Sequence, residues 1–171
     1  FSKRDIRIEA LVEKPLKNHQ GIPDIISTVY LEINRETAKN LSNIRSALLD
    51  KVELKMIMRG RATLEEAVEK DVPIADFMQE YLRSGNMEIE MLNVPRCLTG
   101  RAETPVFDAA PANVFKNSGE IDLDEYVGCY MANWMSVKSA RCAGCGHYAD
   151  CPGIHINHVR AFGFSNIPFG I

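Results

Sequence analysis

Cysteines are the residues of this 171-residue chain whose types and spacing most clearly indicate chemistry. Three of them follow the pattern C-x2-C-x5-C: Cys142, Cys145 and Cys151. Glycines that can supply a permissive backbone lie among them: Gly144, Gly146 and Gly153. The thiolate is the metal-binding form of cysteine, and a C-x2-C step lets two sulfurs reach one centre from a tight turn. A tetrahedral metal, or a cubane with an iron at each corner, needs a fourth ligand, and Cys97 is the best candidate.

The donor type narrows the choice of metal but leaves alternatives open. Four thiolates favour zinc or an iron-sulfur cluster over magnesium, calcium or manganese, which prefer oxygen ligands. Zinc ribbons commonly pair two C-x2-C knuckles, and this chain has only one. His147 could replace a cysteine as a zinc ligand or could shield a cluster. Cys97 could instead be a small buried apolar residue, and Cys129 is expected to pack in a helix outside the site.

Other candidate chemistry is weaker. His155 and His158 are three residues apart, which is compatible with metal binding, but a solvated or hydrogen-bonded pair is the default expectation. The motifs G-x-S-x-G, P-loop and G-x-G-x-x-G do not occur. The sequence therefore gives no support for an α/β-hydrolase, a nucleoside triphosphatase or a dinucleotide-binding protein.

Composition sets the class of protein. The content of 46% hydrophobic and 25% charged residues is that of a folded soluble chain. A net charge of -3 with scattered basic residues gives no reason to expect nucleic acid, and no apolar run is long enough for a membrane span. Five cysteines, an odd number, without a secretory signal disfavour a disulfide framework. Because the chain starts at Phe1 in front of a strand-like segment, we expect an upstream part.

Strands and helices alternate in the first half of the chain. Alternating or β-branched patterns predict strands over 6–12, 27–33, 52–58 and 87–92. Helical spacing with candidate caps at Asn34 and Thr63, a start at Pro73 and a stop at Gly85 predicts helices between them. This alternation produces parallel sheets with helices outside, whose working ends are the carboxyl ends of the strands. Arg59 and Arg61 follow one such end and could bind a carboxylate or phosphate, or could simply be surface residues of a turn.

The second half differs. Residues 99–120 are predicted to form an irregular connection. Residues 122–138 are predicted to form a helix with apolar residues close to one face, and this helix leads to Cys142. A short helix follows Gly153. We therefore predict an α/β fold: residues 1–93 form the C-terminal part of a partial (β/α) barrel, and residues 94–171 form a small cysteine-rich, cluster-binding extension.

A predicted strand leads into Pro95-x-Cys97-Leu98, and an irregular connection and the pattern C-x2-C-x5-C-x-G follow it. This order of features resembles the C-terminal part of a radical S-adenosylmethionine enzyme with a SPASM or Twitch extension. The segments 58–62 and 71–73 resemble the region before that extension. The resemblance implies that one auxiliary [4Fe-4S] cluster is held by four cysteines: Cys97, Cys142, Cys145 and Cys151. With four thiolates the pattern is closer to the Twitch type. The resemblance also implies a place for Arg59 in binding cofactor or substrate.

The family motif C-x3-C-x2-C, which holds the cluster that cleaves S-adenosylmethionine, does not occur in these residues. The resemblance therefore implies an oxidoreductase or peptide- or small-molecule-modifying enzyme that is inactive alone. S-adenosylmethionine and a second [4Fe-4S] cluster would come only with a missing N-terminal half or a partner chain. The alternatives are a non-enzymatic iron-sulfur electron-transfer subunit and a zinc-stabilised interaction module. The oxygen sensitivity of such a cluster implies an anaerobic or well-reduced cytoplasm.

Overall fold

The computed structural model describes residues 8–12, 26–41, 44, 52–85, 89–99, 114–165 and 167. Its main sheet has four strands, all parallel, in the order β1-β2-β3-β4. Their bounds are β1 Ile8–Val12, β2 Ile26–Glu32, β3 Glu53–Ile57 and β4 Glu90–Leu92. Each lies within a predicted strand or one residue from it. Strand order that follows chain order in a parallel sheet requires every connection to cross over in the same sense.

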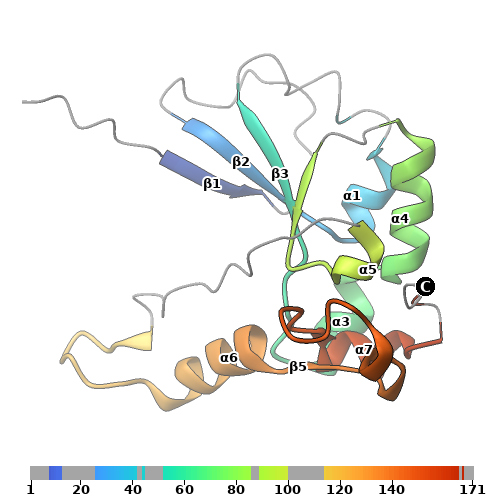
Figure 1. Cartoon of the computed structure of the whole chain (residues 1–171). Coiled ribbons are helices and arrows are strands. Elements are labelled where there is room, and N and C mark those ends of the chain that lie inside the picture. The colour runs from blue at the N-terminus through green and yellow to red at the C-terminus, as the bar shows by residue number, and fades with distance from the viewer. Residues whose placement is uncertain are drawn as a thin grey trace, which may run out of the picture.

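Helices cover one face of this sheet. Figure 1 shows α1 (Arg35–Lys39) and α4 (Ile74–Arg83) on the same side, and α3 (Leu64–Lys70) beyond the end of β3. The predicted caps form: Asn34 accepts a hydrogen bond from the Thr37 amide, and Thr63 accepts one from the Glu66 amide. Gly85 has a φ of 72°, in the left-handed region that ends helices, as predicted. Pro73 differs slightly, because it is the N-cap of α4 and Ile74 is the first helical residue.

The core lies between the sheet and these helices. Its buried apolar side chains alternate along the strands and recur along α4; among them are Val29, Leu31, Leu54, Met56, Met91, Phe77 and Met78. Four predicted core methionines are buried there: Met56, Met58, Met78 and Met91. Met87 lies outside the described residues.

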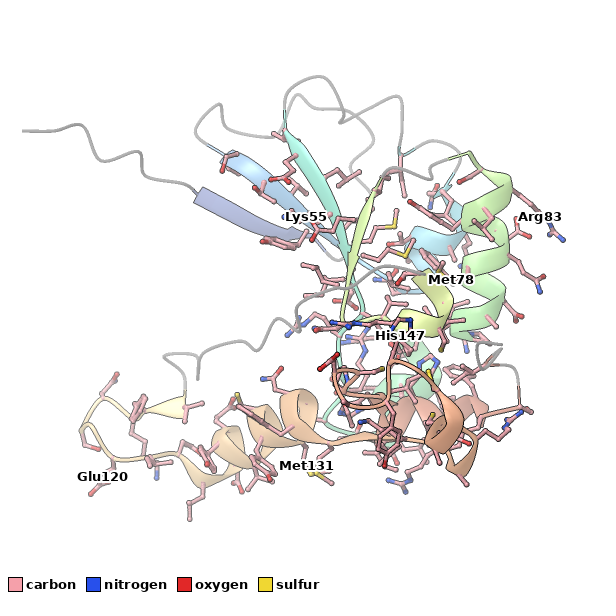
Figure 2. All side chains as sticks on the ribbon, in the orientation of Figure 1. Lys55, Met78, Arg83, Glu120, Met131 and His147 are labelled. Atoms are coloured by element: carbon pink, nitrogen blue, oxygen red, sulfur yellow. The ribbon has the colours of Figure 1, made fainter. Side chains whose placement is uncertain are left out.

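The opposite face of the sheet carries polar side chains. Lys55 lies between Leu54 and Met56 in β3, so its side chain points away from the core, as Figure 2 shows relative to Met78 of α4. The Lys55 Nζ atom lies 2.9 Å from Glu90 Oε2 on β4 and 3.4 Å from Glu53 Oε1. The hydrogen bond to Glu90 is the main cause that raises the pKa of Lys55, against a smaller opposing effect of burial. Strands buried on both faces of a parallel sheet are usually apolar throughout, so this polar face is unusual.

The C-terminal segment lies at the carboxyl ends of the strands (Figure 1). It comprises α6 (Leu123–Trp134), β5 (Ser136–Val137), a 3-10 helix over Ala140–Gly144, β6 (Ile154–His155) and α7 (Ile156–Phe162). Strands β5 and β6 pair antiparallel, and α7 packs on α3. Ile154 and Ile167 join the same core cluster as the sheet. This contact neither supports nor contradicts the predicted boundary after residue 93, which stays a prediction.

Several predicted elements have different bounds. The helix predicted over 122–138 ends at Trp134, because the next residues pair as β5 with β6. The chain after β4 forms the short helix α5 (Arg96–Thr99), which the sequence did not indicate. Residues 100–113 of the predicted connection lie outside the described residues, whereas Phe115 and Ile121 form an antiparallel bridge.

Candidate metal centre

All four candidate ligand cysteines line one cavity. Cys97 comes from α5, and the other three come from the C-terminal segment 45 or more residues later in the chain. The rest of the lining comprises five apolar residues, Pro95, Val137, Ile154, Phe164 and Ile167, together with Lys138, Ser139, His147, Tyr148 and Gly153. The cavity volume of about 30 Å³ exceeds the roughly 10–15 Å³ that one water needs. The fold therefore brings to a common space the three cysteines selected by their spacing and Cys97, the candidate for the fourth ligand.

Pairing of β5 with β6 closes the loop that carries three of these cysteines. Val137 pairs with Ile154, and the Ile156 amide donates to the Met135 carbonyl at 2.7 Å. Within the loop, the Cys145 amide donates to the Cys142 carbonyl at 2.9 Å, which is the tight turn expected for C-x2-C. The Cys151 amide donates to the His147 carbonyl at 3.0 Å and forms a second turn. Backbone bonds thus fix the spacing of the cysteines without side-chain ligands.

Arg96 links the fourth cysteine to this loop. Its Nη1 atom lies 3.7 Å from Asp150 Oδ2, and Arg96 directly precedes Cys97. Lys138, at the start of the loop, contacts Tyr148 within it. The Lys138 Nζ donates to the Tyr148 carbonyl at 2.5 Å and lies 4.3 Å from the centre of the Tyr148 ring. These contacts hold both walls of the cavity together.

Of the three glycines in the cysteine loop, only Gly153 has a backbone conformation that favours glycine. Gly153 has a φ of 93°, and a Cβ there would lie 2.7 Å from the Val137 carbonyl carbon. Gly144 and Gly146 have no positive φ, and a Cβ on either would meet nothing within 4 Å. The prediction that all three are needed by the turn was therefore wrong for two, because the turn itself uses ordinary backbone angles.

The four candidate ligand cysteines line the cavity, but the described side chains do not form a ready ligand set. Among the described residues no group of three or more His, Cys, Asp or Glu side chains is close enough to hold a single metal ion. All five cysteines are described, partly buried and not joined by disulfides. Cys129 lies outside the cavity, in α6, where its sulfur accepts a hydrogen bond from Asn133 at 3.4 Å. Metal binding by the other four stays a prediction.

His147 also lines the cavity and is itself exposed to solvent. Figure 2 shows it in the cysteine-rich loop, below α5. Both roles expected for His147, replacing a ligand or shielding a cluster, fit this position.

A second polar site lies where β2 and β3 end. Arg61 bonds through Nη2 to the Glu32 carboxylate and through Nε to Asp71 Oδ1 at 2.7 Å, and all three side chains are less than 10% exposed. Burial acts to lower the pKa of Arg61, but the charges of Asp71 and Glu32 outweigh it and the pKa is raised. The reading of Arg61 as a surface residue was wrong. Its partners lie 29 and 10 residues away, so no local pattern could reveal them.

Two histidines of the C-terminal segment, His155 and His158, pack onto this site. The His155 Nε2 atom lies 2.6 Å from the Met131 carbonyl, while its Nδ1 accepts from the Asn157 amide at 3.2 Å, which makes Nε2 the protonated nitrogen. Burial lowers the pKa of His155, and the bond to Met131 offsets part of this effect. His158 is buried with its Nδ1 3.6 Å from Asp71 Oδ2. The solvated alternative for this pair was wrong, and hydrogen bonding holds for His155.

Arg59 stands at the edge of the same cluster. Its Nη1 lies 3.9 Å from Glu32 Oε2, and its side chain is 32% exposed. Glu32 Oε2 is buried and has no hydrogen-bond partner among the described residues. Glu32, which no sequence pattern singled out, thus joins Arg59 at the carboxyl end of β2. A role of Arg59 in binding an anionic group stays a prediction.

No protein-family model matches the chain, and no curated protein or solved structure is significantly similar to it. Among the described residues, every helix is too short or too polar to cross a lipid bilayer.

Proposed function

We propose that this chain is the C-terminal part of a radical S-adenosylmethionine enzyme and binds one auxiliary [4Fe-4S] cluster through four cysteines: Cys97, Cys142, Cys145 and Cys151. The observation that carries the proposal is the common cavity of these residues, which come from two separate parts of the chain. Thiols are the donors that such a cluster requires, and partly buried apolar walls favour holding it away from solvent.

A [4Fe-4S] cluster and a zinc ion require different arrangements of the four sulfurs. A tetrahedral zinc site brings all four sulfurs to about 2.3 Å from one point. In a cubane each cysteine binds a different iron, so the sulfurs surround a larger object. Four cysteines that line one cavity are compatible with the second arrangement.

The sheet supports the barrel part of the proposal. The sheet has four parallel strands in chain order, with helices on one face and polar residues on the other. A segment of a (β/α) barrel would have this arrangement if the polar face of the sheet pointed to the barrel interior. The cysteine cavity lies near the carboxyl ends of the strands, where barrel enzymes place their chemistry. When bound, the cluster would supply electron transfer, and the chain's residues would hold it and limit access of water.

Cleavage of S-adenosylmethionine would require a polypeptide with the C-x3-C-x2-C motif and its own [4Fe-4S] cluster, as an N-terminal half or partner. The substrate would be a peptide or small molecule, and the location a reducing cytoplasm. Arg59 would bind a carboxylate or phosphate of cofactor or substrate, because it is partly exposed at the strand end.

Iron and acid-labile sulfide analysis of anaerobically purified protein tests the cluster. We expect about four irons and four sulfides per chain with broad visible absorbance. Replacement of Cys97 or Cys151 by Ala should remove the absorbance, whereas Cys129→Ala, outside the cavity, should retain it. One tightly bound zinc in a colourless sample would refute the proposal and favour a zinc-stabilised module. A full cluster that persists in Cys97→Ala would refute the ligand assignment.

A further inference from the structure

Helix α6 carries an apolar stripe that the chain leaves exposed. Five of its residues recur at helical spacing on one face and are between 45% and 71% exposed: Leu123, Tyr126, Val127, Tyr130 and Trp134. No residue of α6 is buried. Phe115 and Ile121, which form the bridge just before the helix, are also about half exposed, at 51% and 49%.

The C-terminal end of α6 contacts the rest of the protein. The Met131 carbonyl bonds to His155, and the Ala132 carbonyl lies against Gly60. Figure 1 shows α6 extending away from the sheet, and Figure 2 shows Glu120 at its far end and Met131 near the body of the molecule. The helix is therefore held at its C-terminal end and presents its stripe outward.

An isolated helix of this length is marginal in water, and an apolar stripe normally packs against another element. The five stripe residues offer roughly 430 Å² if each contributes about half of its side-chain surface, and Phe115 and Ile121 beside them bring the total to roughly 600 Å². A stable interface buries about 800 Å² per partner. The stripe and a modest rim are sufficient for such an interface.

We propose that the α6 stripe is the interface of a two-fold symmetric dimer, in which α6 packs antiparallel against α6 of a second copy. The charges at the two ends of the stripe identify a second copy as the occupant. At the N-terminal end four acidic residues outnumber the single Lys116: Glu120, Asp122, Asp124 and Glu125. Two basic residues follow the C-terminal end, Lys138 and Arg141, and both keep their charge while they donate to the Tyr148 and Phe164 carbonyls. Antiparallel pairing brings each acidic end to a basic end and places Val127 and Tyr130 near the two-fold axis.

This proposal does not depend on a metal cluster. Sedimentation velocity of the full chain over a range of concentrations should show reversible dimers. Val127→Glu should weaken the dimer at least about a hundredfold, because two carboxylates would then meet near the axis in an apolar interface. Asp124→Lys, at the rim, should weaken it by about tenfold. Val127→Leu should retain it.

Leu82→Glu is the matched control, since Leu82 is 55% exposed on α4, away from the stripe. It should leave dimerisation unchanged, and circular dichroism should show that all variants fold. A wild-type chain that stays monomeric would overturn the proposal and would mean that a different protein or segment covers the stripe. Equal weakening by Leu82→Glu and Val127→Glu would also overturn it, because the effect would then not be located on α6.

Discussion

The substitution Gly60→Ala tests how the C-terminal segment docks on the strand ends. A Cβ built on Gly60 would collide with the Ala132 carbonyl oxygen and lie 2.8 Å from Nε2 of His155. The first neighbour is backbone and the second is a buried ring with two hydrogen bonds, so neither can move cheaply. Gly60 has no positive φ, and the expected effect is therefore steric.

The cost can be estimated from these contacts. Overpacking of a well-packed site costs about 1–3 kcal/mol. Displacement of the His155 ring from the Met131 carbonyl forfeits a hydrogen bond worth about 0.5–1.5 kcal/mol. We expect Gly60→Ala to lower the free energy of unfolding by roughly 2–4 kcal/mol.

Gly128→Ala provides a control with the same added methyl group. Gly128 lies inside α6, and a Cβ there meets nothing within 4 Å. Replacement of a helix-interior glycine by alanine should stabilise the protein by about 0.5–1 kcal/mol. Urea unfolding followed by circular dichroism measures both variants. If Gly60→Ala loses less than about 1 kcal/mol, or if both substitutions shift stability in the same direction, the docking contact described here is wrong.

Three further predictions concern the loop and the buried charges. Gly153→Ala should destabilise the β5-β6 pair by about 1–3 kcal/mol in urea unfolding, whereas Gly146→Ala should be neutral. Arg61→Met should cost about 3–5 kcal/mol because it strands two buried carboxylates, and Arg83→Met, which removes an exposed pair, should cost less than about 1 kcal/mol; similar losses for both would contradict the buried network. Because the pKa of His155 is lowered in the folded protein, its contribution to stability is present above about pH 6.5 and is lost as the pH falls toward the pKa of the folded state. His155→Gln should therefore flatten the pH dependence of the free energy of unfolding below about pH 6.5. An unchanged pH dependence would refute this prediction.

Local signals predicted the described parts of the first half well. The caps Asn34 and Thr63 and the stop at Gly85 each depend on backbone groups within a few residues, so the sequence contains the information needed to recognise them. The strands of the main sheet were recognisable for the same reason, because their alternation persists over several residues. Strands β5 and β6 have two residues each and were missed, since a pattern of period two needs more than two positions.

The sites required a different kind of information. Cysteine spacing could select three members of the cavity, because one loop carries them. The burial of Arg61 could not be predicted, since it depends on Glu32 from another strand and on the C-terminal segment that covers the strand ends. For α6 the periodicity predicted an apolar face but not what covers it. A helical pattern specifies which side of a helix is apolar, whereas burial depends on what packs against that side.

The cysteine cavity and the buried charges are joined through a short stretch of chain. Cys151 lines the cavity, His155 follows it by four residues and bonds to α6, and Asn157 donates to the Arg61 and Ala62 carbonyls at 2.9 and 3.2 Å. A shift of Cys151 on binding a cluster would therefore move the Asn157 amide group, which donates to two backbone carbonyls at the strand ends. A buried carbonyl left without a donor costs about 1–3 kcal/mol. For this reason the position of the cysteine loop and the geometry of the strand ends should change together.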